Sequence, residues 1–150
     1  MITVDEEDWE TPVGAQLRAA QRAELDARYG NSSHEPGVAP TSEDIAVFVV
    51  ARDDTRVGIG CGALRLLDEG EAEIKRMYVI PPERGRGASV AILRQLETSA
   101  RNMGIRVLKL ETGSGQPDAV RFYEREGYSR IDGFGPYIDS PTSICFERTL

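Results

Sequence analysis

Residues 77–93 read MYVIPPERGRGASVAIL, and this stretch decides the fold. Its apolar start is typical of a strand that ends at Pro81 and Pro82, and its last residues have the spacing of a helix. Arginines and glycines lie between the two. Glycines let backbone N–H groups converge, and a helix N-terminus favours negative charge. The stretch therefore predicts a phosphate-binding turn at residues 84–89.

The turn matches neither of the two familiar nucleotide motifs. A Walker loop ends in Gly-Lys-Ser/Thr, and this turn contains no lysine. A dinucleotide fingerprint that begins at Gly85 would need a third glycine at position 90, which is Val90. The sequence therefore indicates a phosphate of another kind. A tight strand–helix turn with solubilising arginines is the alternative interpretation.

Apolar periodicity and turn-forming residues predict the other elements. Thr11 and Pro12 predict the start of a helix that ends near Gly30. Residues 31–44 are turn-formers and indicate a loop. The remaining predicted elements are strands at 45–53, 55–67, 70–80 and 107–112, helices at 87–103 and 117–127, and a final pair of strands at 128–131 and 144–146.

This order predicts an α/β (α+β) fold in one domain, residues 1–150. Strand 70–80, helix 87–103 and strand 107–112 form a βαβ unit, which should be right-handed with parallel strands. The sheet should be mixed and twisted, mostly antiparallel around this central parallel unit, with helices on its flanks.

Composition and charge exclude several classes of function. No apolar run approaches the ~20 residues needed to span a bilayer. The first residues, MITVDEEDWE, lack the basic-then-apolar order of a signal peptide. We therefore expect a cytoplasmic location and no membrane partner. The net charge of −7 argues against a nucleic-acid partner, since binding nucleic acid depends on neutralising its phosphates. The sequence leaves open whether the protein is a monomer or a homodimer.

The charge is unevenly distributed along the chain. Residues 1–54 hold twelve acids and four bases, which indicates a cationic partner near this part or, alternatively, solvated faces that only keep the protein soluble. Cys61 and Cys145 lie far apart without metal-ligand spacing, so both are predicted to be small buried hydrophobic residues. With His34 the one imidazole, no metal site is expected.

The turn resembles the signature of the GNAT (Gcn5-related) N-acetyltransferases, Arg/Gln-x-x-Gly-x-Gly/Ala between a strand and a helix. Its sixth position here is Ser89, where the family has glycine or alanine. A second stretch, LETGSGQPDAVRFYEREGY at 110–128, resembles the family's landmark in which a polar residue opens a helix ending in Tyr-Glu-x-x-Gly-Tyr/Phe. The resemblance covers roughly residues 45–150. It implies the GNAT acyl-CoA N-acyltransferase fold, with acetyl-CoA as the co-substrate.

The resemblance also implies which residues hold the coenzyme. Gln116 stands where the family often has asparagine and would donate to a pantetheine carbonyl. The Val79 N–H would donate to the developing oxyanion. The pantetheine would bind the main chain of Met77, Tyr78 and Val79. The pyrophosphate would bind the turn formed by Arg84, Gly85, Arg86, Gly87, Ala88 and Ser89.

Two residues are the predicted catalytic pair. Tyr123 aligns with the family's general acid, the alternative being an aromatic side chain that only packs beside Phe122. Glu73 is the predicted base, on a strand face shared with Lys75 and Met77. The alternative for Glu73 is a structural ion pair with Lys75 or a neighbouring arginine.

Three further residues are weaker candidates. Glu111 is a second candidate base, and in either case the proton can leave through water. His34 is placed in the acceptor pocket or in a solvated loop, and Tyr137 in the pocket or in the packed interior.

The resemblance implies direct transfer of an acetyl group to a primary amine, without a covalent enzyme intermediate. The acceptor is expected to be a small molecule, and the acidic first third favours a cationic amine, amino acid or polyamine. The sequence leaves open whether acyl groups other than acetyl are also transferred. A non-catalytic sensor that binds acyl-CoA is the alternative function.

Overall fold

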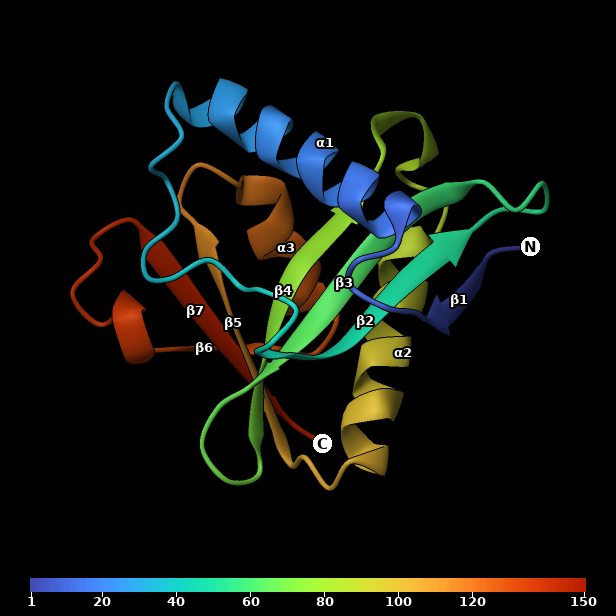
Figure 1. Cartoon of the computed structure of the whole chain (residues 1–150). Helices are drawn as coiled ribbons and strands as arrows, with labels where there is room; N and C mark the ends of the chain where they lie inside the picture. The colour runs from blue at the N-terminus through green and yellow to red at the C-terminus, as the bar shows by residue number, and fades with distance from the viewer.

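The computed structural model describes all residues, 1–150, and arranges them around a seven-stranded sheet of order β1-β2-β3-β4-β5-β7-β6 (Figure 1). The strands are β1 (Thr3–Glu6), β2 (Ile45–Arg52), β3 (Gly58–Leu66), β4 (Glu71–Val79), β5 (Val107–Gly113), β6 (Ser129–Ile131) and β7 (Ser143–Thr149). The helices are α1 (Pro12–Tyr29), α2 (Ala88–Asn102) and α3 (Pro117–Arg125), with short 3-10 turns η1 (Pro81–Glu83) and η2 (Gly135–Tyr137).

The pairing of β4 with β5 is the one parallel pairing in the sheet. It is short, since only Glu71–Glu73 pair with Val107–Lys109. Beyond Glu73, β4 continues beside β3, while β5 continues beside β7 as far as Gly113. The prediction of a mixed sheet with a central parallel βαβ unit is confirmed, and the two parallel strands separate toward their C-terminal ends.

The helices cover the two faces of the sheet. α1 lies across one face, and α2 and α3 lie on the other (Figure 1). β2 is buried on both sides, because Phe48 and Val50 pack in the smaller core cluster with Leu17 of α1, whereas Val47 and Val49 pack in the larger cluster that contains the apolar face of α2. The site described below lies on the α1 side, where this helix crosses β3 and β4.

The first helix begins and ends where the sequence predicts. The Gly14 N–H donates to Thr11 Oγ1 at 3.3 Å, so Thr11 is its N-cap. Gly30 ends it with φ 73°, a left-handed conformation that glycine adopts readily. Both ends of α1 are therefore marked by the residues that the sequence predicts.

β1 is absent from the predicted order of elements. Its residues, TVDE, pair antiparallel with β2, from Thr3 opposite Arg52 to Glu6 opposite Val49. A strand of four residues at the edge of the sheet depends mainly on its main-chain hydrogen bonds. Two of its four side chains are acidic, so the sequence carries little apolar alternation there.

A bulge interrupts β4 next to the site. Cys61 pairs with Tyr78 and Ala63 with Lys75, so Arg76 and Met77 together face the single residue between, and Arg76 has φ 58°. The bulge shifts the alternation of side chains. Lys75 reaches toward the α1 side, while Met77 packs against the core cluster on the α2 side. The prediction that these two share a face is therefore wrong.

Candidate active site

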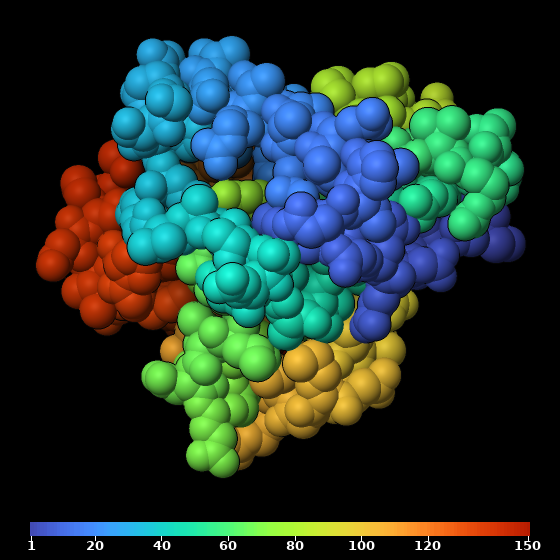
Figure 2. All heavy atoms as spheres, in the orientation of Figure 1, coloured from blue at the N-terminus to red at the C-terminus, as the bar shows by residue number.

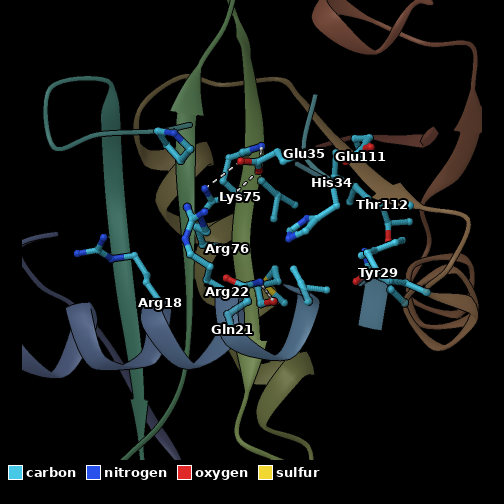
Figure 3. A pocket seen from close by; sticks show the side chains of 18 of the residues that line it. Arg18, Gln21, Arg22, Tyr29, His34, Glu35, Lys75, Arg76, Glu111 and Thr112 are labelled. Atoms are coloured by element: carbon cyan, nitrogen blue, oxygen red, sulfur yellow. Dashed lines mark hydrogen bonds and ion pairs between the residues drawn. The ribbon is translucent and has the colours of Figure 1, made fainter. Parts of the chain in front are cut away.

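A cavity of about 400 Å³ opens where β4 and β5 separate, and α1 covers it (Figure 3). The space-filling view shows α1 and the 31–44 loop over the sheet, with only a small yellow-green patch visible between them (Figure 2). Three short stretches supply much of the wall, and α1 supplies a further side. The stretches are Ile74–Met77 of β4, Leu110–Gly113 of β5, and Gln116, Ala119 and Tyr123 at and within α3.

Tyr123 is the predicted acid, and it lies on the cavity wall. The residue is 7% exposed, and its ring packs against Tyr128 and Phe146. Burial raises the pKa of the Tyr123 hydroxyl, so the group keeps its proton at neutral pH. Tyr123 thus contributes a protonated side chain to the cavity wall, while its ring also packs in the core.

Glu73, the predicted base, does not line the cavity. Its side chain is 4% exposed, and its Oε2 accepts a hydrogen bond from the Tyr137 hydroxyl at 2.6 Å and lies 3.6 Å from Lys75 Nζ. Tyr137 is itself buried and also accepts a hydrogen bond from Lys75 Nζ at 3.1 Å. Glu73 and Tyr137 are therefore joined in a packed, charged network behind the wall, as the structural alternatives for both residues describe.

Glu111 has a different position. It lines the cavity from β5, and Ser143 Oγ donates to its carboxylate at 2.6 Å. Burial raises the pKa of the Glu111 carboxyl, and the Ser143 hydrogen bond and the charge of Lys75 oppose this only in part. A carboxylate with a raised pKa on the wall is suited to accept a proton.

Glu35 belongs to the site although the sequence did not single it out. Its carboxylate accepts hydrogen bonds from Arg76 at 2.6 and 3.0 Å and from Lys75 at 3.0 Å (Figure 3). Burial would raise the pKa of Glu35, but the hydrogen bonds from Arg76 and the charge of Lys75 outweigh it and lower this pKa to about 2. Glu35 therefore ties the 31–44 loop to β4 as a carboxylate.

His34 lies on the cavity wall and not in a solvated loop position. Its Nε2 is 2.8 Å from Asp26 Oδ1, and its ring stacks on Tyr29 with centroids 5.2 Å apart. The Tyr29 hydroxyl in turn accepts a hydrogen bond from Gln116 Nε2 at 3.2 Å. The amide predicted to bind pantetheine is thus held at the end of α1, beside the backbone of Gly113.

Only some of the main-chain hydrogen-bonding groups at the C-terminal end of β4 have partners in the protein. Met77 O accepts a hydrogen bond from Gln21 Nε2 at 2.9 Å, and Val79 O accepts one from Arg84 Nε at 2.8 Å. The Ile80 N–H donates to Ile59 O. Because antiparallel pairs alternate, the N–H of Val79 points away from β3 and toward the separated side. Of the three residues predicted to hold pantetheine, only Met77 lies on the cavity wall itself.

The turn at 84–89 offers unused donors outside the cavity. Gly85 and Gly87 have φ of 79° and 90°, and no heavy atom lies within 4 Å of where a Cβ would be on either. α2 begins at Ala88, and its first main-chain hydrogen bond runs from the Ala91 N–H to Gly87 O. The N–H groups of residues 85–90 have no acceptor in the protein. They lie at the positive end of a helix and suit an anion.

The side chains of the two arginines in this turn, which were expected to bind the pyrophosphate, lie close to glutamates. Arg84 forms an ion pair with Glu24 of α1 at 2.7 Å, and Arg86, 69% exposed, lies 3.5 Å from Glu83. The side chain of Arg84 therefore joins the turn to α1, and the backbone supplies the free donors.

The two cysteines are free and buried, as predicted. Burial raises the pKa of Cys61 to about 12 and also raises that of Cys145, so both remain thiols at neutral pH. No three histidine, cysteine, aspartate or glutamate side chains are grouped as metal ligands would be. No helix has the length and apolarity needed to cross a membrane.

The charge of the cavity differs from the expectation. Its acids are Glu35 and Glu111, whereas its arginines and lysine number four. Some other acids of the first third pair away from the cavity, as Glu7 does with Arg52 and Glu24 with Arg84. Basic residues therefore outnumber acids on the cavity wall, and the cationic acceptor stays a prediction. The basic residues of the wall are Arg18, Arg22, Lys75 and Arg76.

Comparison with known proteins agrees with this geometry. Residues 4–128 match the model of the acetyltransferase (GNAT) family. An IAA acetyltransferase from Azospirillum brasilense is 38% identical over 104 residues, which cover 69% of this chain and 67% of that protein. A structure assigned to the acyl-CoA N-acyltransferases, from Klebsiella pneumoniae, is 30% identical with a TM-score of 0.86 and covers 100% of this chain and 98% of that one.

A GNAT acetyltransferase from Elizabethkingia anophelis was solved with acetyl-CoA bound. It has a TM-score of 0.74 at 20% identity, with coverage of 99% of this chain and 98% of that one, and it shares the fold. Fold, sequence match and cavity position lead to one conclusion. The chain belongs to the GNAT acetyltransferase family.

Proposed function

We propose that this acetyltransferase moves an acetyl group directly from acetyl-CoA to a primary amine of a small molecule. One observation carries the proposal. The parallel strands part after Glu73, and the hydroxyl-bearing ring of Tyr123 lies on the wall of the cavity that opens between them. A thioester seated in that gap would have a proton donor on one side and α1 on the other.

The coenzyme would be held at three places. The free N–H groups of the turn would receive its pyrophosphate at the positive end of α2, and Gly85 and Gly87 leave room for its approach. The main chain of β4 would hold the pantetheine. Gln116 would add a side-chain donor. The complete proposed set is Met77, Tyr78, Val79, Arg84, Gly85, Arg86, Gly87, Ala88, Ser89 and Gln116.

The chemistry requires a neutral amine at the thioester carbonyl. A C–N bond forms as the C–S bond breaks, and the amine proton leaves the site. The Val79 N–H donates to the oxygen that becomes negative, and Tyr123 donates its proton to the departing thiolate. An alkyl ammonium has a pKa of ~10.4, so a base that removes its proton lowers the barrier at neutral pH.

We assign that base to Glu111, acting through water, in preference to the predicted Glu73. Glu111 lies on the cavity wall with a raised pKa. Glu73 lies behind the wall, bound to Tyr137 and close to Lys75. Glu73 stays in the proposal as the alternative, and variants of both residues distinguish them.

The proposal has no covalent enzyme intermediate. The raised pKa values of Cys61 and Cys145 keep both thiols protonated, and neither lies on the cavity wall. We also propose that the protein is cytoplasmic, because free thiols persist in that compartment.

The test combines coenzyme binding with product analysis. Purified protein is incubated with acetyl-CoA and a panel of primary amines, and thiol release is followed together with the mass of the acceptor. Thiol release that requires an amine and yields the N-acetyl product supports the proposal. Tight binding of acetyl-CoA without any acetylated product would support the sensor function instead.

A further inference from the structure

Two arginines of α1 face the cavity without a carboxylate partner. Arg22 forms no hydrogen bond or ion pair with the rest of the protein, and Arg18 forms a single hydrogen bond, from Nη2 to the carbonyl of Trp9 at 2.7 Å. The two are four residues apart, so they extend from the same side of the helix. Both line the cavity in which the acceptor of the proposed reaction would sit.

Arg18 is held in place by an aromatic ring. Its guanidinium carbon lies 3.8 Å from the centroid of the Trp9 ring, and the Nε atom is buried without a hydrogen-bond acceptor. Burial lowers the pKa of Arg18, the charge of Glu10 opposes this in part, and the charge of Arg76 adds to the lowering. A positive group that is partly desolvated and repelled by another cation gains from an anion more than a solvated arginine does.

The other cations of the wall already have carboxylate partners. Glu35 forms ion pairs with both Arg76 and Lys75, and Glu73 lies 3.6 Å from Lys75. Neither Glu35 nor Glu111 forms a hydrogen bond or ion pair with Arg18 or Arg22. The positive charge left over in the cavity is therefore that of the two arginines on α1.

The space beside these arginines is open. Ala15 and Ala19 lie on the same side of α1 and line the same cavity, and their short side chains fill little of it. Figure 3 shows Arg18, Gln21 and Arg22 along α1, with Arg76 and Lys75 on β4 beyond them.

We propose that Arg18 and Arg22 bind an anionic group of the amine acceptor, a carboxylate or a phosphonate. The inference rests on the proposed function and gives it a substrate class, namely small amines that carry a negative charge at the end away from the amine. Arginine suits this role, since its planar fork matches the two oxygens of such a group.

The kinetic test uses four acceptors of similar length. β-Alanine and aminoethylphosphonate are anionic, β-alaninamide lacks the negative charge, and diaminopropane carries a second cation. We expect kcat/KM to be at least about 10-fold higher for one or both anionic acceptors than for β-alaninamide, as for a charge-assisted hydrogen bond. Diaminopropane should be the poorest. Equal rates for β-alanine, aminoethylphosphonate and β-alaninamide would overturn the proposal.

Variants then locate the anion. Arg22→Gln and Arg18→Gln should remove most of the preference for the anionic acceptors while leaving kcat/KM for β-alaninamide within about 3-fold, which a general structural defect would not do. Arg28→Gln is the matched control, because Arg28 lies on α1 but not on the cavity wall. Equal losses for charged and neutral acceptors would contradict the assignment.

A binding experiment separates this inference from the proposed reaction. Propylphosphonate, which has no amine, is titrated calorimetrically into protein saturated with coenzyme A, so that the pyrophosphate site is filled. We expect binding that weakens at least about 10-fold in Arg22→Gln and persists in Arg28→Gln. If this holds while no amine is acetylated, the transferase proposal fails and the anion site stands. If wild type and Arg22→Gln bind propylphosphonate equally, or neither binds it, the anion site fails.

Discussion

Glu35 and Arg76 form a two-point ion pair, with Oε2 2.6 Å from Nη1 and Oε1 3.0 Å from Nη2. The pair joins the 31–44 loop to the bulge of β4, where Arg76 has φ 58°. A non-glycine residue in the left-handed region is strained, and it persists where its surroundings fix it. The loop that covers the cavity and the bulge that shapes its floor therefore stabilise each other.

Replacing Glu35 should destabilise the protein. In Glu35→Gln, Arg76 and Lys75 lose their shared carboxylate, and we expect the free energy of unfolding at pH 7 to fall by about 2 kcal/mol, less than for a fully buried pair because the Glu35 side chain is 25% exposed. Urea unfolding measures this fall. The control is Glu43→Gln, an exposed acid of the same loop, which should change the value by less than about 0.5 kcal/mol.

The same comparison has a defined pH dependence. Because the folded pKa of Glu35 is about 2 and its ordinary value is 4.5, its contribution is complete above pH 4.5 and is lost as the pH falls toward 2. The stability difference between wild type and Glu35→Gln should shrink over that range. A difference that stays constant down to pH 2 would show that the carboxylate charge is not what stabilises the loop.

Tyr123→Phe should reduce turnover and spare the coenzyme. Loss of the proton donor is expected to lower kcat by about 100-fold, the lower end for general acid catalysis, with the Kd for acetyl-CoA changed less than about 3-fold. Tyr128→Phe is a suitable control, because Tyr128 packs against Tyr123 but donates to Glu97 and does not line the cavity. Unaltered thiol release in Tyr123→Phe would remove this residue from the mechanism.

Glu111 and Glu73 can be separated by pH–rate profiles. Burial raises the pKa of Glu111, so in wild type kcat/KM should rise with pH through an apparent pKa above 4.5, as the carboxyl loses its proton. Glu111→Gln should abolish this limb and lower kcat by about 100-fold. Glu73→Gln should mainly reduce stability, since it disturbs Tyr137 and Lys75. The opposite pattern would restore Glu73 as the base.

The turn at 84–89 can be tested with a matched pair of substitutions. Gly87 has φ 90° and open space at its Cβ position, so Gly87→Asp and Gly87→Asn carry the same backbone strain and almost the same shape. Only the aspartate places a negative charge at the N-terminus of α2. We expect the Kd for coenzyme A to rise at least about 10-fold more in Gly87→Asp than in Gly87→Asn. Equal effects would show that this backbone does not hold the phosphates.

Much of the fold could be predicted, because its signals are local. Thr11, Pro12 and Gly30 mark the ends of α1, and the change from strand to helix spacing around the glycine-rich turn marks the parallel unit. β1 was missed because its pairing with β2 comes from the main chain. The bulge at Arg76 was missed because no glycine or proline stands there, and the register of β3 against β4 is a long-range property.

The candidate site was predictable only where a family motif covers it. Tyr123 and Met77, which the motifs single out, both lie on the cavity wall. We propose Glu111 in place of Glu73 as the base because Tyr137 and Lys75 hold Glu73 away from the cavity. No sequence pattern indicates this network. Likewise, Arg18 and Arg22 have the spacing of an ordinary solvated helix face. Only the packing of α1 over the gap shows that they face inward.

The contact between Arg18 and Trp9 provides an optical reporter. Trp9 is the one tryptophan of the chain, it is 7% exposed, and a guanidinium covers its ring. The emission of an indole depends on the charge directly above its ring, so any ligand that draws Arg18 away or neutralises it should change the fluorescence of the whole protein. Occupancy of the cavity can thus be read in unlabelled protein, without a coupled assay and before any acceptor is identified.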